Sequence, residues 1–401
     1  MNYKFVKVSK FYPSYLNYFY DNNSNLPVDY NEHLQVLLDD CFAYGDAFSR
    51  HLSKLGNNTH EIIYNDKILQ KKWANQNNVS YFKDWKNIIL SKQLEKIEPD
   101  VIFWNMNVGN ESIQNIIKNI SSVKINFTQI GVSIYDWRKF EPFDFVITCL
   151  KYQVEKLKKK NIDAFFIRHG FNKKVLDKIE SSTSDIDFSF VGSLHWHHKK
   201  RAEYIKFLSE YSPLKTWTNN SVNPNIVDYL KYIIKKSLAN IPDIIKALDI
   251  NRNKLINRII NISTKWDKYN LISFPQQIIN KFQKPLYGID MFQVLQNSKI
   301  SLNVHVDDAK KFAANIRMYE VTGVGTCLLT ERKKDIKEYF TPGYEIVTYK
   351  SKEEALEKVK YLLENEKKIE QIAKRGQERT LKEHTLEKRI KKINTIIQRY
   401  L

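Results

Sequence analysis

The chain has 401 residues, of which 42% are hydrophobic, and it carries a formal net charge of +19. This length accommodates two compact domains with separate cores. No apolar run reaches the roughly 20 residues that a membrane-spanning helix needs, and the chain starts without the apolar block of a secretory signal, so we expect a cytoplasmic protein.

The excess of positive charge predicts an anionic partner. It arises from 64 Lys and Arg against 45 Asp and Glu. We do not expect nucleic acid, because the sequence has no Arg-Gly repeats, zinc-finger spacing or RNA-recognition signature. Two candidates for the anionic partner remain: a phosphorylated substrate, and the anionic inner face of the cell membrane in a peripheral contact. Cys41, Cys149 and Cys327 are far apart and predict buried thiols.

Residues 3–8 predict the first strand, and the aromatic stretch 9–22 is interpreted as a loop with a turn at Pro13. In an open α/β sheet, ligands bind beyond the carboxyl ends of the strands. Four side chains of this stretch are therefore candidate ligand contacts: Lys10, Tyr12, Tyr15 and Tyr18. Packing against a neighbouring domain is an equally good interpretation of these aromatic residues.

Strands and helices alternate through the rest of the first half. Helical spacing predicts one crossover helix over residues 31–55 and another over residues 84–97. Apolar runs predict further strands at residues 60–66, 100–106, 124–134, 143–150 and 164–172, with a basic helix at residues 151–161. The alternation predicts an α/β fold with a parallel sheet and a Rossmann-like domain over residues 1–183.

The second domain begins with the strand and glycine turn DFSFVGS, followed by a helix with a basic start. This order is the phosphate-binding geometry of nucleotide folds. Gly192 forms the turn, and His198, Lys199, Lys200 and Arg201 cluster at the positive end of the helix. The neighbouring His195, His197 and His198 lack a second ligand cluster, so we expect no metal site.

Structural predictions can be made for two further segments of the second domain. Residues 219–284 predict a helical insertion with a basic amphipathic face, which would contact a membrane or a protein partner or would simply cover the domain. After it, the strand ISLNVHV places His305, Asp307 and Asp308 at its carboxyl end, where they should line a cleft.

The segment NIRMYEVTGVGTCLLT, residues 315–330, predicts a short helix feeding a buried strand. Asn315 is the expected N-cap, and Arg317 and Glu320 lie three apart on one helix face. The helix start and Arg317 would bind an anion, while Glu320 would accept two ribose hydroxyls, which suits a nucleoside diphosphate. The alternative is an exposed Arg–Glu ion pair without a ligand.

This segment and the residues after it, up to Arg389, resemble the C-terminal signature of nucleotide-sugar glycosyltransferases with two Rossmann-like domains, the GT-B fold. More narrowly, they resemble the spore-maturation-protein-like relatives of glycosyltransferase family 4. The resemblance implies an acceptor domain over residues 1–183, a donor domain over 184–385, and a last helix over 386–401 that packs back toward the first domain.

The resemblance also implies a function and a set of site residues. The enzyme would transfer a hexosyl or related group from a nucleotide sugar to a saccharide or lipid-linked acceptor, in bacterial surface polysaccharide biosynthesis and without a metal cofactor. The nucleotide would be held by Glu320, Asn315, Arg317, Lys199, Arg201, Gly192 and His198. His169, His305 and Arg317 would act near the reacting carbon, although a structural role for His169 is an equal alternative.

One position departs from the family pattern. Family 4 enzymes often carry two glutamates eight positions apart, and with Glu320 as the second, the first falls on Phe312. The donor-sugar contact of that glutamate therefore does not transfer, and the stereochemical outcome stays open. A non-catalytic protein that kept the fold for partner binding or structure is the alternative function.

Overall fold

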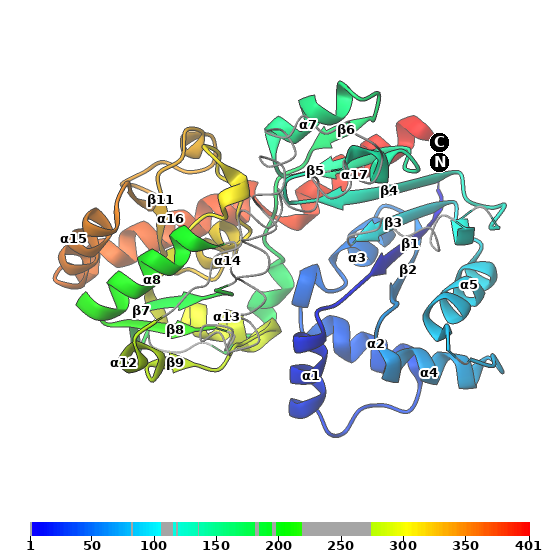
Figure 1. Ribbon diagram of the computed structural model, residues 1–401, viewed down its shortest axis with the longest axis horizontal. Coiled ribbons are helices and arrows are strands. Elements are labelled where there is room, and N and C mark those ends of the chain that lie inside the picture. Colours follow the sequence, from blue (N-terminus) through cyan, green and yellow to red (C-terminus); the bar gives the residue numbers. More distant parts are fainter. Residues whose placement is uncertain are drawn as a thin grey trace, which may run out of the picture.

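The computed structural model describes residues 2–81, 83–105, 115–117, 119–134, 136–180, 184–194, 198–218 and 274–401. These residues form two parallel six-stranded sheets, each flanked by helices (Figure 1). The strand orders are β2-β1-β3-β4-β5-β6 and β12-β11-β10-β7-β8-β9. The predicted α/β class with two Rossmann-like domains is confirmed. Among the described helices, none combines the length and apolar composition needed to cross a membrane.

The first sheet has central strands that are largely buried on both faces, whereas the edge strands β2 and β6 are partly exposed. Its strands are β1 (Lys4–Ser9), β2 (Asn58–Ile63), β3 (Val101–Asn105), β4 (Ile125–Ile130), β5 (Phe145–Thr148) and β6 (Ala164–Phe166). The helices around it are α1 (Pro13–Asn22), α2 (Tyr30–Asp39), α3 (Ala47–Ser53), α4 (Lys67–Gln76), α5 (Trp85–Ile97) and α7 (Lys151–Lys158). Phe103, Phe127 and Phe145 are register partners on adjacent strands, and their rings stack with centroids 4.6 Å apart in each pair.

The single helix predicted over residues 31–55 is wrong. The chain forms α2, a short 3-10 turn η1 (Phe42–Tyr44), and α3. Cys41, Ala43 and Tyr44 have positive φ angles of 58°, 48° and 79°, which a right-handed helix cannot contain. The Gly45 carbonyl of this turn accepts a hydrogen bond from Lys7 Nζ at 3.1 Å, so the break is fixed by contact with β1.

Two other expectations for the first domain are corrected. Most of the aromatic stretch 9–22 is helical instead of a loop, because Pro13 occupies the first turn of α1, where its missing N–H costs nothing. Helix α4 was not predicted; its N-cap is Asp66, whose Oδ1 accepts from Leu69 N at 3.0 Å. Both helices bury their apolar side chains against α2 and the end of β2.

The second sheet contains β7 (Ile186–Val191), β8 (Leu214–Trp217), β9 (Phe282–Gln283), β10 (Ser298–Asn303), β11 (Cys327–Glu331) and β12 (Val347–Tyr349). Its helices are α8 (Lys199–Tyr211), α12 (Gln276–Ile279), α13 (Gly288–Gln296), α14 (Arg317–Gly323), α15 (Lys352–Leu363) and α16 (Glu366–Glu383). Most of the predicted insertion, residues 219–273, lies outside the described residues. The end of that span supplies β9, which pairs with β8 at the edge of the sheet.

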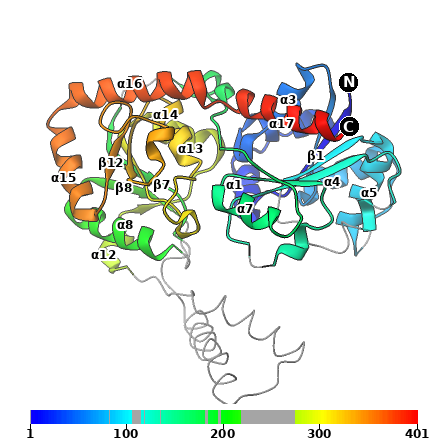
Figure 2. The same cartoon turned by 90° about the horizontal axis from the view of Figure 1, so that it is seen from above.

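The last helix, α17 (Leu386–Tyr400), lies against the first domain, although it follows α16 of the second (Figure 2). Its buried apolar residues are Leu386, Ile390, Ile393, Ile396 and Ile397, and they share one core cluster with Phe5 and Phe103. At the crossing, Phe171 N donates to His384 O at 2.8 Å and Leu386 N donates to Phe171 O at 2.9 Å. The C-terminus therefore completes the core of the N-terminal domain.

Candidate active site

The candidate site lies at the carboxyl end of β10, a central strand of the second sheet, between the segment that enters α8 and the start of α14. Ligands of open α/β sheets bind at this edge. The carbonyl of Val304 organises the site, because Arg201 Nη2 and Asn315 Nδ2 both donate to it at 3.1 Å. Arg201 Nη1 also donates to Ser193 O at 3.0 Å. Three segments that are distant in sequence are thus joined around one guanidinium.

Arg201 is a buried cation without an ion-pair partner among the described residues. It is 8% exposed, and its Nε has no hydrogen-bond acceptor there. Burial, followed by the nearby charge of Arg317, lowers the pKa of Arg201 to about 10. The guanidinium still carries its charge at neutral pH, so the site holds positive charge that a bound anion would neutralise.

Arg317 and Glu320 form an ion pair in the first turn of α14. Arg317 Nη1 lies 2.9 Å from Glu320 Oε2, and their side chains are only 18% and 13% exposed. The same nitrogen contacts Met291 Sδ of α13 at 2.9 Å. Burial raises the pKa of Glu320, and the charge of Arg317 opposes this shift. The pair is therefore largely shielded from solvent, unlike the exposed pair of the alternative interpretation.

Asn315 is not the N-cap of α14. Ile316 holds that position in a helical conformation, without a side-chain cap, and the helix begins at Arg317. The Asn315 amide instead braces the exit of β10: its Oδ1 accepts from Val306 N at 3.3 Å, and its Nδ2 donates to Asn303 Oδ1 at 2.8 Å as well as to Val304. These contacts across the fold outweigh the local capping preference.

His305 lies beneath the site and is 1% exposed. Its Nδ1 accepts from Ala314 N at 3.5 Å, and its Nε2 is 3.4 Å from Thr330 Oγ1. Burial, together with the charges of Lys333, Arg201 and Lys200, holds the pKa of His305 well below its usual value. The imidazole is therefore neutral at pH 7, and its contacts suit a positioning role better than proton transfer.

His169 belongs to the first domain and lies against α17. Its Nδ1 is 2.5 Å from the hydroxyl of Tyr44, and its backbone carbonyl accepts from Arg389 Nε at 3.1 Å. Burial and the charge of Arg389 lower the pKa of His169 to about 4. Burial also raises the pKa of Tyr44. The sequence analysis missed Tyr44, whose hydroxyl contacts His169 from the turn between α2 and α3.

Of the basic run at the start of α8, only Arg201 is drawn into the site. Lys199 is 65% exposed, and its Nζ is 4.0 Å from Glu203 Oε1. Residues two apart point to different sides of a helix, so Lys199 and Arg201 cannot act as a side-by-side pair. Lys200 pairs with Glu331 at the end of β11. The N-cap of α8 is His198, which is buried.

The remaining predicted residues have distinct surroundings. Gly192 N donates to Trp217 O at 3.0 Å, which ties the glycine turn to β8. Tyr15 is fully buried and stacks on Phe42 with centroids 3.7 Å apart, so it packs rather than faces a ligand. Tyr12 is 65% exposed. His195 and His197 lie outside the described residues.

Direct contacts connect the two domains around this site. Tyr152 Oη donates to Asp308 O at 2.9 Å, and Arg168 Nη2 lies 2.9 Å from Glu338 Oε2. Asp40 Oδ1 accepts from Ile289 N at 3.1 Å at the start of α13. The carboxyl ends of both sheets therefore face a shared boundary, with the donor-side cations in one domain and Tyr44 and His169 in the other.

Comparisons with known proteins agree with this architecture. Residues 242–395 match a family model described as glycosyl transferase-like. A glycosyltransferase structure from Rickettsia africae matches with a TM-score of 0.55 and 9% identity, over 100% of this chain and 98% of that one. The Anabaena protein HepE, solved with UDP and glucose, gives 0.53 and 10%, over 99% and 100%. An alpha-glucosyltransferase, solved with UDP-glucose and DNA containing an abasic site, gives 0.56 and 12%, over 99% of each chain.

The search of curated proteins found no match. At these identities the structural likeness concerns the fold, and the family match concerns the C-terminal part of the chain. Both agree with the arrangement of two Rossmann-like sheets and with the position of the site on the second. The chain therefore has the GT-B fold, and its residues 242–395 match the glycosyl transferase-like family.

Proposed function

We propose that the protein transfers a hexosyl group from a nucleoside diphosphate sugar to a saccharide or lipid-linked acceptor, in the biosynthesis of a surface polysaccharide. The observation that carries the proposal is Arg201, a buried guanidinium whose Nε has no acceptor in the described part of the chain and whose pKa is lowered by burial and by the charge of Arg317. Buried charge is unfavourable unless it is paired, and a diphosphate would supply the pairing.

The chemistry assigns a role to each part of the site. Breaking the bond between the sugar's anomeric carbon and the diphosphate oxygen leaves negative charge on that oxygen. Arg201 and Arg317, held in place before reaction, would stabilise this charge without a bound metal. Glu320 would accept hydrogen bonds from the ribose hydroxyls, because Arg317 and its surroundings hold its carboxylate on one face of α14.

The first domain would bind the acceptor. Tyr44 and His169 form a hydrogen-bonded pair on its side of the boundary. With a pKa of about 4, His169 is neutral at pH 7 but is a weak base there, so it suits hydrogen bonding that positions an acceptor hydroxyl better than removal of its proton. A UDP sugar is the first donor to test, since two of the similar structures hold UDP or UDP-glucose.

The first experiment is a thermal-shift screen of wild type against UDP, GDP, ADP, CMP and dTDP, because ligand binding raises apparent stability. Arg201→Met should abolish the shift seen with the best nucleotide. Lys199→Met removes an exposed charge from the same helix and should leave it intact. Transfer assays with the corresponding sugars then follow. A screen in which no nucleotide stabilises the protein, or in which both variants behave alike, would contradict the assignment.

A non-catalytic role is the second candidate, and position 312 favours it. Phe312 occupies the place of the glutamate that contacts the donor sugar in family 4 enzymes, and its ring lies 5.5 Å from Lys311 Nζ. Nucleotide binding without hydrolysis or transfer of any donor sugar would support this role, whereas turnover with a defined acceptor would rule it out.

We further propose that the protein contacts an anionic membrane from its cytoplasmic side. Beside the carboxyl ends of β10 and β11, the surface carries exposed cations that form no ion pair with a described carboxylate: Lys310, Lys311, Arg332, Lys334, Lys337 and Lys350. Lys310 Nζ also lies 4.7 Å from the ring of Tyr152 in the first domain, so this surface borders the domain boundary. Such a surface attracts anionic headgroups, and salt weakens the attraction.

A further inference from the structure

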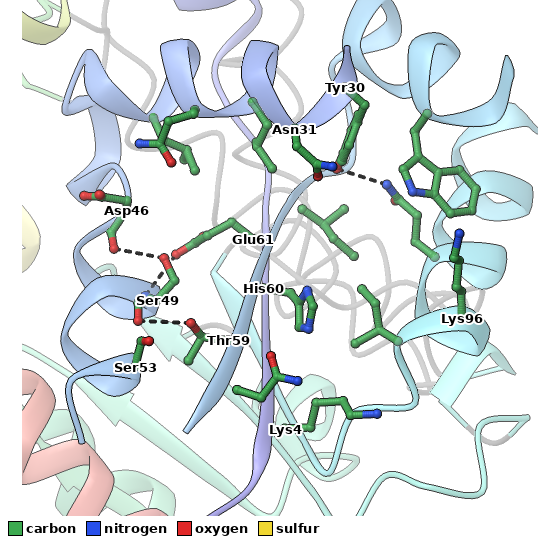
Figure 3. Close-up of a pocket in the computed structure, with 18 of the residues that line it drawn as sticks. Lys4, Tyr30, Asn31, Asp46, Ser49, Ser53, Thr59, His60, Glu61 and Lys96 are labelled. Atoms are coloured by element: carbon green, nitrogen blue, oxygen red, sulfur yellow. Dashed lines mark hydrogen bonds between the residues drawn. The ribbon is translucent and has the colours of Figure 1, made fainter. Parts of the chain in front are cut away.

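A hollow of about 760 Å³ lies at the outer edge of the first sheet (Figure 3). Strand β2 runs past its floor, and residues of α2, α3, α4 and α5 form its walls. Neither Arg201, Arg317 nor Glu320 lines it, so it is separate from the candidate active site. No role has been assigned above to this hollow, although its size is that of a ligand pocket.

The floor offers main-chain hydrogen-bonding groups. Strand β2 is the first in its sheet and pairs only with β1. Asn58 N donates to Tyr3 O and Tyr64 N donates to Ser9 O, so the even-numbered residues of β2 face β1. Thr59 and Glu61 consequently direct their N–H and C=O groups away from β1, on the open side of the sheet, where a ligand can reach them.

The walls are rich in neutral hydroxyl and amide groups. They come from Asn31, Gln35, Ser49, Ser53, Thr59 and Gln93. Gln93 is 2% exposed; its Nε2 donates to Tyr30 Oη at 3.1 Å, and its Oε1 has no partner among the described residues. A buried acceptor without a donor is unfavourable, and a ligand hydroxyl would satisfy it.

The carboxylates that line the hollow are paired within the protein. Glu61 Oε2 lies 3.0 Å from Lys7 Nζ, and Asp46 Oδ1 lies 3.3 Å from Arg50 Nε. Lys4 and Lys96 also line the hollow, and Lys96 Nζ donates to Asn77 Oδ1 at 2.5 Å. Trp73 adds flat apolar surface to the polar walls, whereas Tyr30 is mostly covered. The hollow therefore combines many neutral donors and acceptors with an aromatic face, and the described residues of its lining offer no unpaired carboxylate.

We propose that this hollow binds a segment of a neutral oligosaccharide. A sugar chain presents hydroxyl donors and acceptors on all sides and apolar C–H faces on its rings, which match the hydroxyls, amides, free peptide groups and aromatic rings of the hollow. An extended peptide pairing with β2 would instead need apolar pockets for alternate side chains, and these walls are mostly polar. The proposal does not depend on catalysis; if the chain is a transferase, the hollow would retain the glycan acceptor outside the cleft.

The test starts with labelled full-length protein on an array of neutral and charged glycans, followed by calorimetry with the best neutral tetrasaccharide. Asn31→Trp would fill the hollow from an exposed position on α2, and Gln93→Leu would remove the unsatisfied acceptor. Each should weaken binding at least tenfold. Glu32→Trp, next to Asn31 but outside the hollow, is the matched control and should bind as wild type does.

Two further measurements keep the outcome decisive. Arg201→Met should bind the glycan normally, and the hollow variants should keep the thermal shift with nucleotide, so failure of this proposal is distinguishable from failure of the donor site. The proposal is overturned if no neutral glycan binds, if Arg201→Met loses binding while Asn31→Trp keeps it, or if a peptide competes for the hollow and glycans do not. Because Asn31 is exposed, its variant stays informative even if Gln93→Leu does not fold.

Discussion

Replacing Asp40 by asparagine should stabilise the protein at neutral pH. Asp40 lies at the domain boundary, where its carboxylate accepts from Ile289 N at 3.1 Å. Burial raises its pKa to about 6 from an ordinary value of 3.8, and the charge of Asp290 adds to the shift. Since each pKa unit corresponds to about 1.36 kcal/mol, keeping Asp40 ionised at pH 7 costs about 3 kcal/mol.

The sign of the pH dependence follows from the raised pKa. The folded state binds the Asp40 proton more tightly than the unfolded state, so this group contributes stability below pH 4, and the contribution is lost as the pH rises through about 6. An asparagine side chain at this position cannot ionise. Asp40→Asn should therefore exceed wild type in free energy of unfolding by up to about 3 kcal/mol at pH 7, with the difference vanishing near pH 4.

Urea denaturation at pH 4, 5, 6 and 7 measures this difference, and the adjacent residue supplies a control of opposite sign. Burial opposes ionisation of Asp39, but hydrogen bonds from Lys174, Gln35 and Lys178 outweigh it and lower its pKa. Asp39→Asn should accordingly destabilise the protein by a nearly constant amount from pH 7 down to about pH 4, because the contribution of a carboxyl with a lowered pKa is lost only below its unfolded value of 3.8. Equal effects of Asp40→Asn at pH 4 and pH 7, or destabilisation throughout, would refute the reasoning.

Three further predictions concern the site, the core and the basic surface. Glu320→Gln should weaken binding of a nucleoside diphosphate without weakening binding of inorganic pyrophosphate in calorimetry, because the proposed ribose contact is weakened while Arg317, released from its ion pair, stays available to phosphate; equal losses would argue against that contact. Ile393→Ala in α17 should lower the free energy of unfolding by about 2–5 kcal/mol in urea titrations, since Ile393 is 1% exposed in the core of the first domain; a change under about 1 kcal/mol would show that the helix is not anchored there. Lys334→Glu combined with Lys337→Glu should reduce flotation with phosphatidylglycerol vesicles in low salt, while Lys367→Glu on α16 should not; flotation insensitive to salt or to these changes would contradict an electrostatic contact.

The fold was predictable because its strands are short apolar runs separated by helices, a pattern that only a covered parallel sheet satisfies. The interruption of the helix at residues 41–45 could not be predicted, since nothing in the local sequence requires it. It is fixed by distant partners: Lys7 donates to Gly45 O, and Asn172 Nδ2 donates to Tyr44 O at 3.4 Å. Tyr44 was missed for the same reason, because its contacts His169 and Asn172 come from another part of the chain.

Site residues were predicted correctly where their contacts follow from spacing within one helix, and incorrectly where their contacts come from distant segments. Arg317 and Glu320 meet because three residues of helix separate them, and that spacing is visible in the sequence. Lys199 and Arg201 could have been told apart by the same rule, because two residues of helix separate them. The role of Asn315 could not be predicted, because its side-chain amide hydrogen-bonds Val306 N and Asn303 Oδ1 instead of capping its own helix.

The segment between α2 and α3 connects the stability of the domain boundary to the candidate site. Asp40 holds the start of α13, and Met291 of α13 contacts Arg317, which in turn holds Glu320. Tyr44, four residues after Asp40, contacts His169 Nδ1 at 2.5 Å. A shift of this segment would therefore move both the helix that supports Arg317 and the tyrosine that contacts His169. For this reason the affinity for nucleotide should change with Asp40→Asn if the boundary rearranges, and should stay constant if the substitution relieves only the cost of a buried charge.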